Sequence, residues 1–129
     1  MSDTIRLAPL PRSVSEARRF VAERASDLPR EVRDILELCV AELAANCVLH
    51  AITHFTVTVK REDSLRIEVT DVGLGSVQPR DPSDHDLRGR GLRIVAALAD
   101  TWGVLPAQQP PGKTVWAEFE LAKATALGQ

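Results

Sequence analysis

The sequence predicts one α+β domain built as a two-layer α/β sandwich, with about three helices packed on a mixed, mostly antiparallel sheet of about five strands. Two observations lead to this fold class. Segments whose apolar residues recur with the helical period of about 3.6 residues are followed by segments in which apolar and polar residues alternate. The chain has 129 residues, 44% of them hydrophobic, which is enough for a single domain with its own core.

Three segments have the apolar spacing of a helix. The first runs from Val14 to about Ala25, and Ser13 or Ser15 can cap it because a serine hydroxyl accepts a hydrogen bond from a free backbone N–H. The second runs from Arg30 to about His50, after a break that contains a proline. Leu92–Ala99 is the third and shortest.

Five segments are predicted as strands, since apolar and polar residues alternate in them. They are Thr4–Ala8, Phe55–Arg61, Leu65–Thr70, Trp102–Leu105 and Val115–Leu121, of which the second and third should form a hairpin. Residues 76–91 are polar and contain two prolines, so we expect a loop long enough to be a functional lid. Residues 122–129 are expected to be a frayed tail.

Composition and charge restrict the possible partners. Lys and Arg number 16 against 18 Asp and Glu, so nothing in the net charge of -2 favours direct binding of nucleic acid. No apolar run approaches the roughly 20 residues needed to cross a bilayer, and the N-terminus has no export signal, so a cytoplasmic protein is expected. Cys39 and Cys47 would lie about 12 Å apart on one helix, too far for a disulfide.

The second predicted helix carries three polar side chains along one stripe. Glu42, Asn46 and His50 follow one another four residues apart. Between Leu38 and Leu49 only Glu42 and Asn46 interrupt an apolar surface, and a helix that is apolar nearly all round should be buried. Burying a carboxylate and an amide without partners is costly, so either the core supplies partners or the stripe lines a wet, charged cavity. In a cavity, Glu42 can accept a proton and Asn46 can offer an oxygen to a hard cation. We expect His50 to be structural.

Two glycine-containing stretches could contact a ligand. Asp71 ends a predicted strand and is followed by Gly73 and Gly75, which would let a flat ligand approach the backbone while the carboxylate accepts a hydrogen bond from an exocyclic amine. Gly89-Arg-Gly91 precedes a predicted helix, where free backbone N–H groups form a natural phosphate site. Taken alone, the first stretch is more often a plain turn and the second more often a flexible hinge.

A third stretch, Gly112-Lys-Thr114, is similar to part of a P-loop but does not complete one. Ala107 occupies the place of the required upstream glycine, and a strand pattern follows where a helix is needed. We therefore interpret it as a turn whose Thr114 hydroxyl and backbone lie at the edge of a site built elsewhere.

In their order along the chain, these four stretches resemble the GHKL ATPase/kinase superfamily. E-x-x-x-N on a helix, D-x-G-x-G after a strand, G-x-G before a helix and G-K-T before a final strand are similar to its N, G1, G2 and G3 boxes, over roughly Thr4 to Leu121. The compact length and the segments Ser13–Val21 and Arg90–Gly103 resemble the stand-alone anti-sigma factor serine/threonine kinases of actinobacteria. The resemblance implies a single ATP-binding domain with the Bergerat (GHKL) fold over residues 1–129.

The resemblance also implies ATP and Mg²⁺ as cofactors, with a role for each box. Asn46 would bind Mg²⁺, and Glu42 would be the general base that takes the proton of an attacking serine hydroxyl. Asp71 would bind the adenine amine, with Gly73 and Gly75 admitting the ring. The phosphates would be contacted by Arg88, Gly89, Arg90 and Gly91, and Thr114 would lie near the water network on the adenine side. Leu87 stands where these kinases have a lid arginine.

The implied function is that of an anti-sigma regulatory factor that phosphorylates a STAS-type anti-anti-sigma antagonist on serine or threonine. A sigma factor would be its other partner, and a homodimer is possible, with Thr4–Pro11 as a candidate edge strand for pairing. Two alternatives stay open. ATP could merely organise the protein-binding surface of a non-catalytic anti-sigma factor, or the chain could be an interaction module that has lost ATP binding.

Overall fold

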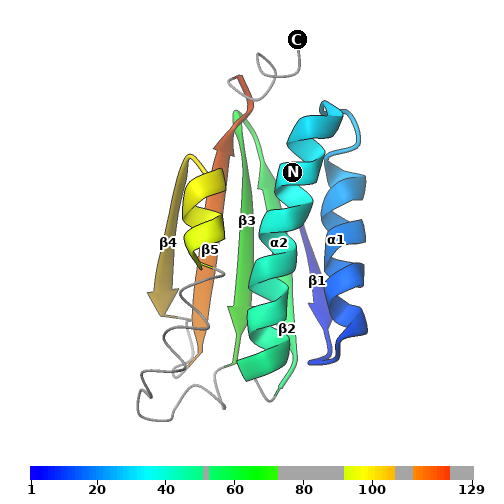
Figure 1. The fold of residues 1–129 in the computed structure, drawn as a ribbon, viewed down its shortest axis with the longest axis vertical. Coiled ribbons are helices and arrows are strands. Elements are labelled where there is room, and N and C mark those ends of the chain that lie inside the picture. The colour runs from blue at the N-terminus through cyan, green and yellow to red at the C-terminus, as the bar shows by residue number, and fades with distance from the viewer. Residues whose placement is uncertain (51–52, 73–91, 107–111, 123–129) are drawn as a thin grey trace.

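The computed structural model describes residues 1–50, 53–72, 92–106 and 112–122. This part of the chain forms two layers, a five-stranded sheet and three helices that cover one of its faces (Figure 1). The helices are α1 (Arg12–Arg24), α2 (Arg30–His50) and an unlabelled one at residues 92–98. The strands are β1 (Ser2–Leu7), β2 (Phe55–Arg61), β3 (Ser64–Asp71), β4 (Thr101–Pro106) and β5 (Lys113–Glu120). The two-layer α+β fold predicted from the sequence is confirmed.

The strand order is β1-β2-β3-β5-β4, and every neighbouring pair is antiparallel. Within the described residues the sheet is therefore wholly antiparallel, where the sequence predicted a mixed, mostly antiparallel one. The connections explain the difference. The pairs β2–β3 and β4–β5 are each consecutive in the chain, and β5 turns back to lie between β3 and β4.

Alternation along β3 separates the two faces of the sheet. Leu65, Ile67 and Val69 are buried under the helices, whereas the residues between them are only half-buried. Asp71 continues the buried series, so its side chain belongs to the face that the helices cover. The other face, which carries Thr70 among others, has no helix on it in the part of the chain that the structure describes (Figure 1).

Helix α2 is the centre of the helical layer, with α1 on one side and the helix at residues 92–98 on the other (Figure 1). Its core-facing residues are Val32, Leu36, Cys39, Val40, Leu43, Ala44 and Cys47. The sequence predicted a helix buried nearly all round, but Leu38 is 45% exposed and Leu49 is 69% exposed. A helix lying on one sheet needs only one apolar stripe, and in a two-layer fold nothing in the described residues covers the opposite side.

Helix α1 begins two residues earlier than predicted, at Arg12, and neither serine caps it. Pro11 occupies the N-cap position with φ -54° and ψ -37°, and no side chain bonds a free backbone N–H there. The Ser13 hydroxyl donates instead to the carbonyl oxygen of Ala8 at 2.6 Å, inside the core. Proline has helical φ already and no N–H to satisfy, so the helix extends back to it without a capping serine.

Both cysteines are free and buried, as predicted. Burial raises the pKa of each thiol to about 12. None of the described helices is long and apolar enough to cross a membrane. The tail predicted at residues 122–129 lies outside the described residues from position 123 onward.

Candidate functional site

The candidate site lies at the end of the molecule where α2 and β3 finish and β5 starts. Helix α2 runs alongside β3 in the same direction, so His50 at its end and Asp71 at the end of β3 reach the same end of the molecule (Figure 1). Because β5 is antiparallel to β3, its first residue, Lys113, pairs with Asp71. This arrangement brings together polar residues from three distant parts of the chain.

Asp71 is a buried carboxylate on the helix-facing side of the sheet. Only 6% of the residue is exposed, and its Oδ2 lies 3.8 Å from Nζ of Lys113. Burial raises the pKa of the Cys47 thiol, the Asp71 charge raises it further and the Lys113 charge lowers it. Both charged groups are therefore close to Cys47, which places them directly beneath α2. A carboxylate withdrawn from water at the end of a strand is a strong acceptor for a ligand's N–H groups.

Glu42 and Asn46 lie on the flank of α2 that faces away from α1. Glu37 marks the opposite flank, since it lies 3.8 Å from Arg18 of α1. Nine residues separate Glu37 from Asn46, which is roughly half a turn around the helix axis at about 100° per residue. Both Glu42 and Asn46 are half-buried, and the stripe predicted from the sequence therefore faces the side of the helix at residues 92–98 (Figure 1).

Asn46 lies in the last turns of α2, near the end of the molecule that Asp71 also reaches. It precedes Cys47 by one residue, and the Asp71 charge raises the pKa of the Cys47 thiol. Glu42 lies one turn earlier, about 6 Å farther along the axis. Burial raises the pKa of the Cys39 thiol, and the Glu42 carboxylate raises it further. Glu42 therefore lies near the buried side of α2. His50, at the end of α2, is half-buried.

Thr114 does not share the face of the sheet that carries Asp71. Its hydroxyl lies 2.7 Å from the hydroxyl of Thr70, its register partner, on the side away from the helices. Lys113 points to the Asp71 side instead, and the sequence analysis did not single it out. The alternation of buried and half-buried residues along β5 could have identified Lys113. Val115, Ala117 and Phe119 are buried, so position 113 belongs to the inward series and position 114 to the outward one.

Six predicted site residues lie outside the described residues. They are Gly73, Gly75, Arg88, Gly89, Arg90 and Gly91. Their assignments, and the lid predicted at residues 76–91, remain predictions. Of the predicted site residues that the structure does describe, Glu42 and Asn46 lie on α2, Asp71 lies on the helix-facing side of the sheet, and Thr114 lies on the other side.

The donor set suits Mg²⁺ only with help from a ligand. Among the described residues, no group of three or more His, Cys, Asp or Glu side chains could hold a metal ion. Mg²⁺ commonly takes one or two protein oxygens and completes its octahedron with phosphate oxygens and water. The amide oxygen of Asn46, half-buried on the flank of α2, fits that mode.

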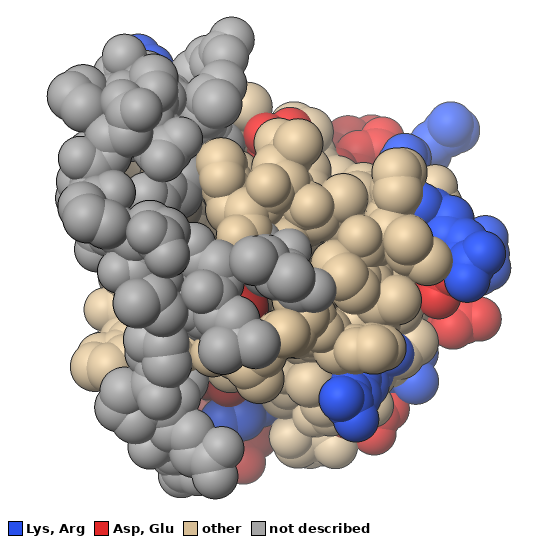
Figure 2. All heavy atoms as spheres, turned by 90° about the horizontal axis from the view of Figure 1, so that it is seen from below, with Lys and Arg blue, Asp and Glu red and all other residues tan. Residues whose placement is uncertain are grey.

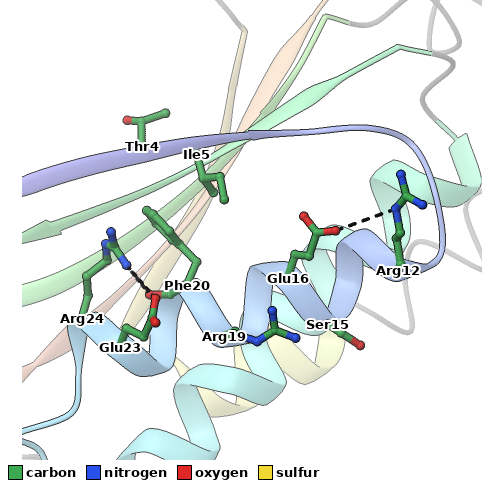
Figure 3. A pocket seen from close by; sticks show the side chains of 9 residues that line it. All are labelled: Thr4, Ile5, Arg12, Ser15, Glu16, Arg19, Phe20, Glu23 and Arg24. Carbon is green, nitrogen blue, oxygen red and sulfur yellow. Dashed lines mark hydrogen bonds and ion pairs between the residues drawn. The ribbon is translucent and has the colours of Figure 1, made fainter.

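A groove lies on the far side of α1, between that helix and the edge strand β1 (Figure 3). Thr4, Ile5 and Phe20 line it together with charged side chains of α1. Two of its arginines pair within the groove, Arg12 with Glu16 at 3.9 Å and Arg24 with Glu23 at 3.4 Å. Viewed from below, Lys and Arg side chains gather on this α1 side (Figure 2). The groove is separated from Asp71 and Asn46 by α1, so it is not part of the candidate site.

The family model described as the histidine kinase-like ATPase domain matches residues 7–119. No curated protein sequence matches this chain.

Among solved structures, the chain is similar to the RsbU and RsbW domains of Rv1364c from Mycobacterium tuberculosis. The TM-score is 0.71 at 15% sequence identity, and the match covers 93% of this chain but 32% of the other. At this identity the similarity shows the fold. The chain thus corresponds to about a third of that longer protein.

Proposed function

The chain belongs to the histidine kinase-like ATPase family, and we propose that it is an ATP-binding anti-sigma factor that phosphorylates its antagonist protein on serine or threonine. The observation that carries the nucleotide site is the position of Asp71. Its carboxylate is buried at the end of β3, on the helix-facing side of the sheet and close enough to Cys47 of α2 to raise the pKa of that thiol. An amino group of adenine provides the N–H donor that such a carboxylate accepts.

Glu42 and Asn46 have separate roles in the proposed reaction. The Asn46 amide oxygen would hold Mg²⁺, which neutralises phosphate charge as the phosphoryl group is transferred. Glu42, one turn away on the same flank, would take the proton of the attacking hydroxyl. Glu42 is half-buried, so part of the residue is accessible to an incoming side chain. In the direction of the chain along α2, the proposed base Glu42 comes first and the proposed metal ligand Asn46 second. The proposed adenine acceptor, Asp71, lies beyond them.

The proposed partners are a STAS-type anti-anti-sigma protein as phosphoryl acceptor and a sigma factor as the sequestered protein, in the cytoplasm. The sequence resemblance to actinobacterial anti-sigma kinases supports them, and so does the fold shared with a chain that contains an RsbW domain. A homodimer is part of the proposal, because β1 is an edge strand of the sheet and offers backbone groups to a second copy.

A transfer assay tests the kinase activity. Purified protein, ATP labelled at the γ-phosphate and a candidate STAS-domain antagonist are incubated with Mg²⁺, and phosphoserine and phosphothreonine are identified on the antagonist by mass spectrometry. Transfer that depends on both Mg²⁺ and the antagonist supports the proposal. Absence of transfer to every STAS-domain protein tested, with ATP binding intact, contradicts the kinase activity.

A second candidate function is a nucleotide-binding anti-sigma factor without kinase activity. The observation in its favour is Leu87, which stands where the related kinases have a lid arginine. Arginine can neutralise charge on the γ-phosphate with several N–H donors, and leucine cannot. Under this candidate, ATP binding would alter affinity for the sigma factor, and the Glu42 carboxylate would have no effect on any measured property of the complex.

A further inference from the structure

Lys113 occupies a position that gives the site a cation next to its buried acceptor. It is the register partner of Asp71, and both side chains lie on the helix-facing side of the sheet. The Asp71 side chain is 7% exposed and that of Lys113 is 28% exposed. A ligand that reaches the Asp71 carboxylate therefore meets the Lys113 ammonium as well.

The distance between the two groups leaves Lys113 able to bind a ligand. Nζ lies 3.8 Å from Oδ2 of Asp71, whereas hydrogen bonds between an ammonium and a carboxylate measure about 2.7–2.9 Å. An ammonium has three N–H donors and a side chain of four methylenes, so it can turn a donor toward a third group without leaving the carboxylate. The Asp71–Lys113 pair thus offers one acceptor and one donor side by side.

An alternative explanation is that Lys113 merely neutralises a buried charge. Removing Lys113 would then destabilise the protein, since a buried carboxylate without its counter-charge is costly. That explanation does not predict any dependence on which atoms the ligand carries. The two explanations therefore differ in what a change in the ligand does.

We propose that Lys113 is a specificity-determining residue that donates a hydrogen bond to ring nitrogen N1 of adenine while Asp71 accepts one from the 6-amino group. This inference rests on the proposed ATP site. The 6-amino group and N1 are a donor and an acceptor next to each other on the edge of the ring, which matches the carboxylate and the ammonium in that order. A 6-oxo purine such as hypoxanthine reverses the pattern, with an acceptor facing Asp71 and an N–H facing Lys113. The pair should therefore select adenine over hypoxanthine.

The test removes the proposed acceptor atom from the ligand and the proposed donor from the protein. ATP and 1-deaza-ATP, in which C–H replaces N1, are titrated calorimetrically with Mg²⁺ into wild type and Lys113→Met. We expect the wild type to bind 1-deaza-ATP about tenfold or more weakly than ATP, because a hydrogen bond with a charged partner is lost. Lys113→Met should bind the two nucleotides within about twofold of each other. Lys113→Arg, which keeps a cationic donor, should restore part of the preference for ATP.

Matched controls separate this effect from a general loss of charge. Lys60→Met removes a lysine that pairs with Glu68 at 3.4 Å on β2 and β3, away from the site, and should keep the full preference for ATP. Melting temperatures verify that each variant is folded. If Lys113→Met does not fold, Lys113→Arg and Lys113→Ala are compared instead, and only the arginine, which keeps N–H donors, should prefer ATP over 1-deaza-ATP.

The outcomes also distinguish this inference from the proposed function. If wild type and Lys113→Met lose the same affinity when 1-deaza-ATP replaces ATP, or if neither loses affinity, the role of Lys113 is overturned and the ATP site still stands. No binding of ATP to the wild type would overturn the ATP site, and the role of Lys113 with it.

Discussion

The Asp71 carboxylate of the sheet and the Cys47 thiol of α2 are electrostatic neighbours: burial raises the pKa of the thiol to about 12, and Asp71 contributes to the increase. The pKa of the Cys39 thiol is raised similarly, by burial and then by the charge of Glu42. The two carboxylates of the candidate site thus each lie beside a buried cysteine of the same helix. The thiols are chemical reporters for the packing under that site.

Both thiols should be inert in the folded protein. Thiolate is the reactive form, and at pH 8 almost none is present when the pKa is about 12. We expect iodoacetamide at pH 8 to label neither cysteine in buffer and both in guanidinium chloride, as counted by mass spectrometry. Rapid labelling of Cys47 in the folded state would show that α2 does not pack on Asp71 as described.

The same pKa values predict how stability changes at high pH. The pKa is raised from 9.0 to about 12, so the folded protein keeps these protons where the unfolded chain loses them. Their contribution to stability is complete below pH 9 and is lost as the pH rises from 9 toward 12. Urea unfolding at several pH values should show a smaller decline above pH 9 in a Cys39→Ala, Cys47→Ala variant than in the wild type. Equal declines would contradict the raised pKa values.

Glu42 should matter for phosphoryl transfer and not for nucleotide binding. Glu42→Gln removes the proposed base while keeping size, so transfer to the antagonist should fall by about 10²–10⁴-fold. Glu37→Gln is the matched control, since Glu37 lies on the opposite flank of α2 near Arg18. We expect it to keep both transfer and ATP affinity. A Glu42→Gln protein with normal transfer would contradict the assignment of Glu42 as the base.

Arg61 should stabilise the junction between the end of α1 and the β2–β3 hairpin. It donates to both carboxylate oxygens of Asp27, at 2.7 and 2.6 Å, and to the carbonyl oxygen of Arg24 at 3.1 Å. Asp27 is largely exposed, so Arg61→Met should lower the free energy of unfolding by only about 1 kcal/mol. Hydrogen bonding from Arg61 lowers the pKa of Asp27 below 3.8, so the contribution is present above that pH and lost below it. Chemical denaturation at pH 7 and pH 3 checks both statements: an equal loss at the two values would contradict them.

Gly103 should tolerate no side chain without a shift of Trp116. A Cβ at position 103 would lie 2.9 Å from three atoms of the Trp116 ring, on the face of the sheet without helices. Gly103→Ala should therefore cost about 1–3 kcal/mol in urea unfolding and change the near-ultraviolet circular dichroism. In a Trp116→Leu background the cost should shrink, because the ring is gone. An equal cost in both backgrounds would show that the ring is not the obstacle.

Periodicity in the sequence was enough to predict the elements of this fold. The helical spacing over Arg30–His50 and the alternation over Phe55–Arg61 match α2 and β2 residue for residue. The strand order was not predictable from such local patterns, because insertion of β5 between β3 and β4 depends on contacts between segments far apart in sequence. Exposure of Leu38 and Leu49 was missed for a related reason, since composition does not say how many layers will cover a helix.

For the candidate site, the resemblance to the GHKL superfamily predicted that one helix and one strand end contribute to the same site. Glu42, Asn46 and Asp71 were selected from their spacing and their positions at element ends. Thr114 was selected from a motif, while its neighbour Lys113 faces Asp71. A motif specifies residue types, but the pleat of a strand decides which of two adjacent side chains faces the site.

The most direct measurement is calorimetric titration of ATP, with and without Mg²⁺, into the wild type, Asp71→Asn and Asn46→Ala. Glu68→Gln is the control, because it neutralises a carboxylate of β3 on the face away from the helices. We expect Mg²⁺-dependent binding by the wild type and by Glu68→Gln. Asp71→Asn should bind about tenfold or more weakly, and Asn46→Ala should lose the effect of Mg²⁺. Undiminished binding by Asp71→Asn, or no binding by the wild type at millimolar ATP, would contradict an ATP site at this end of the sheet.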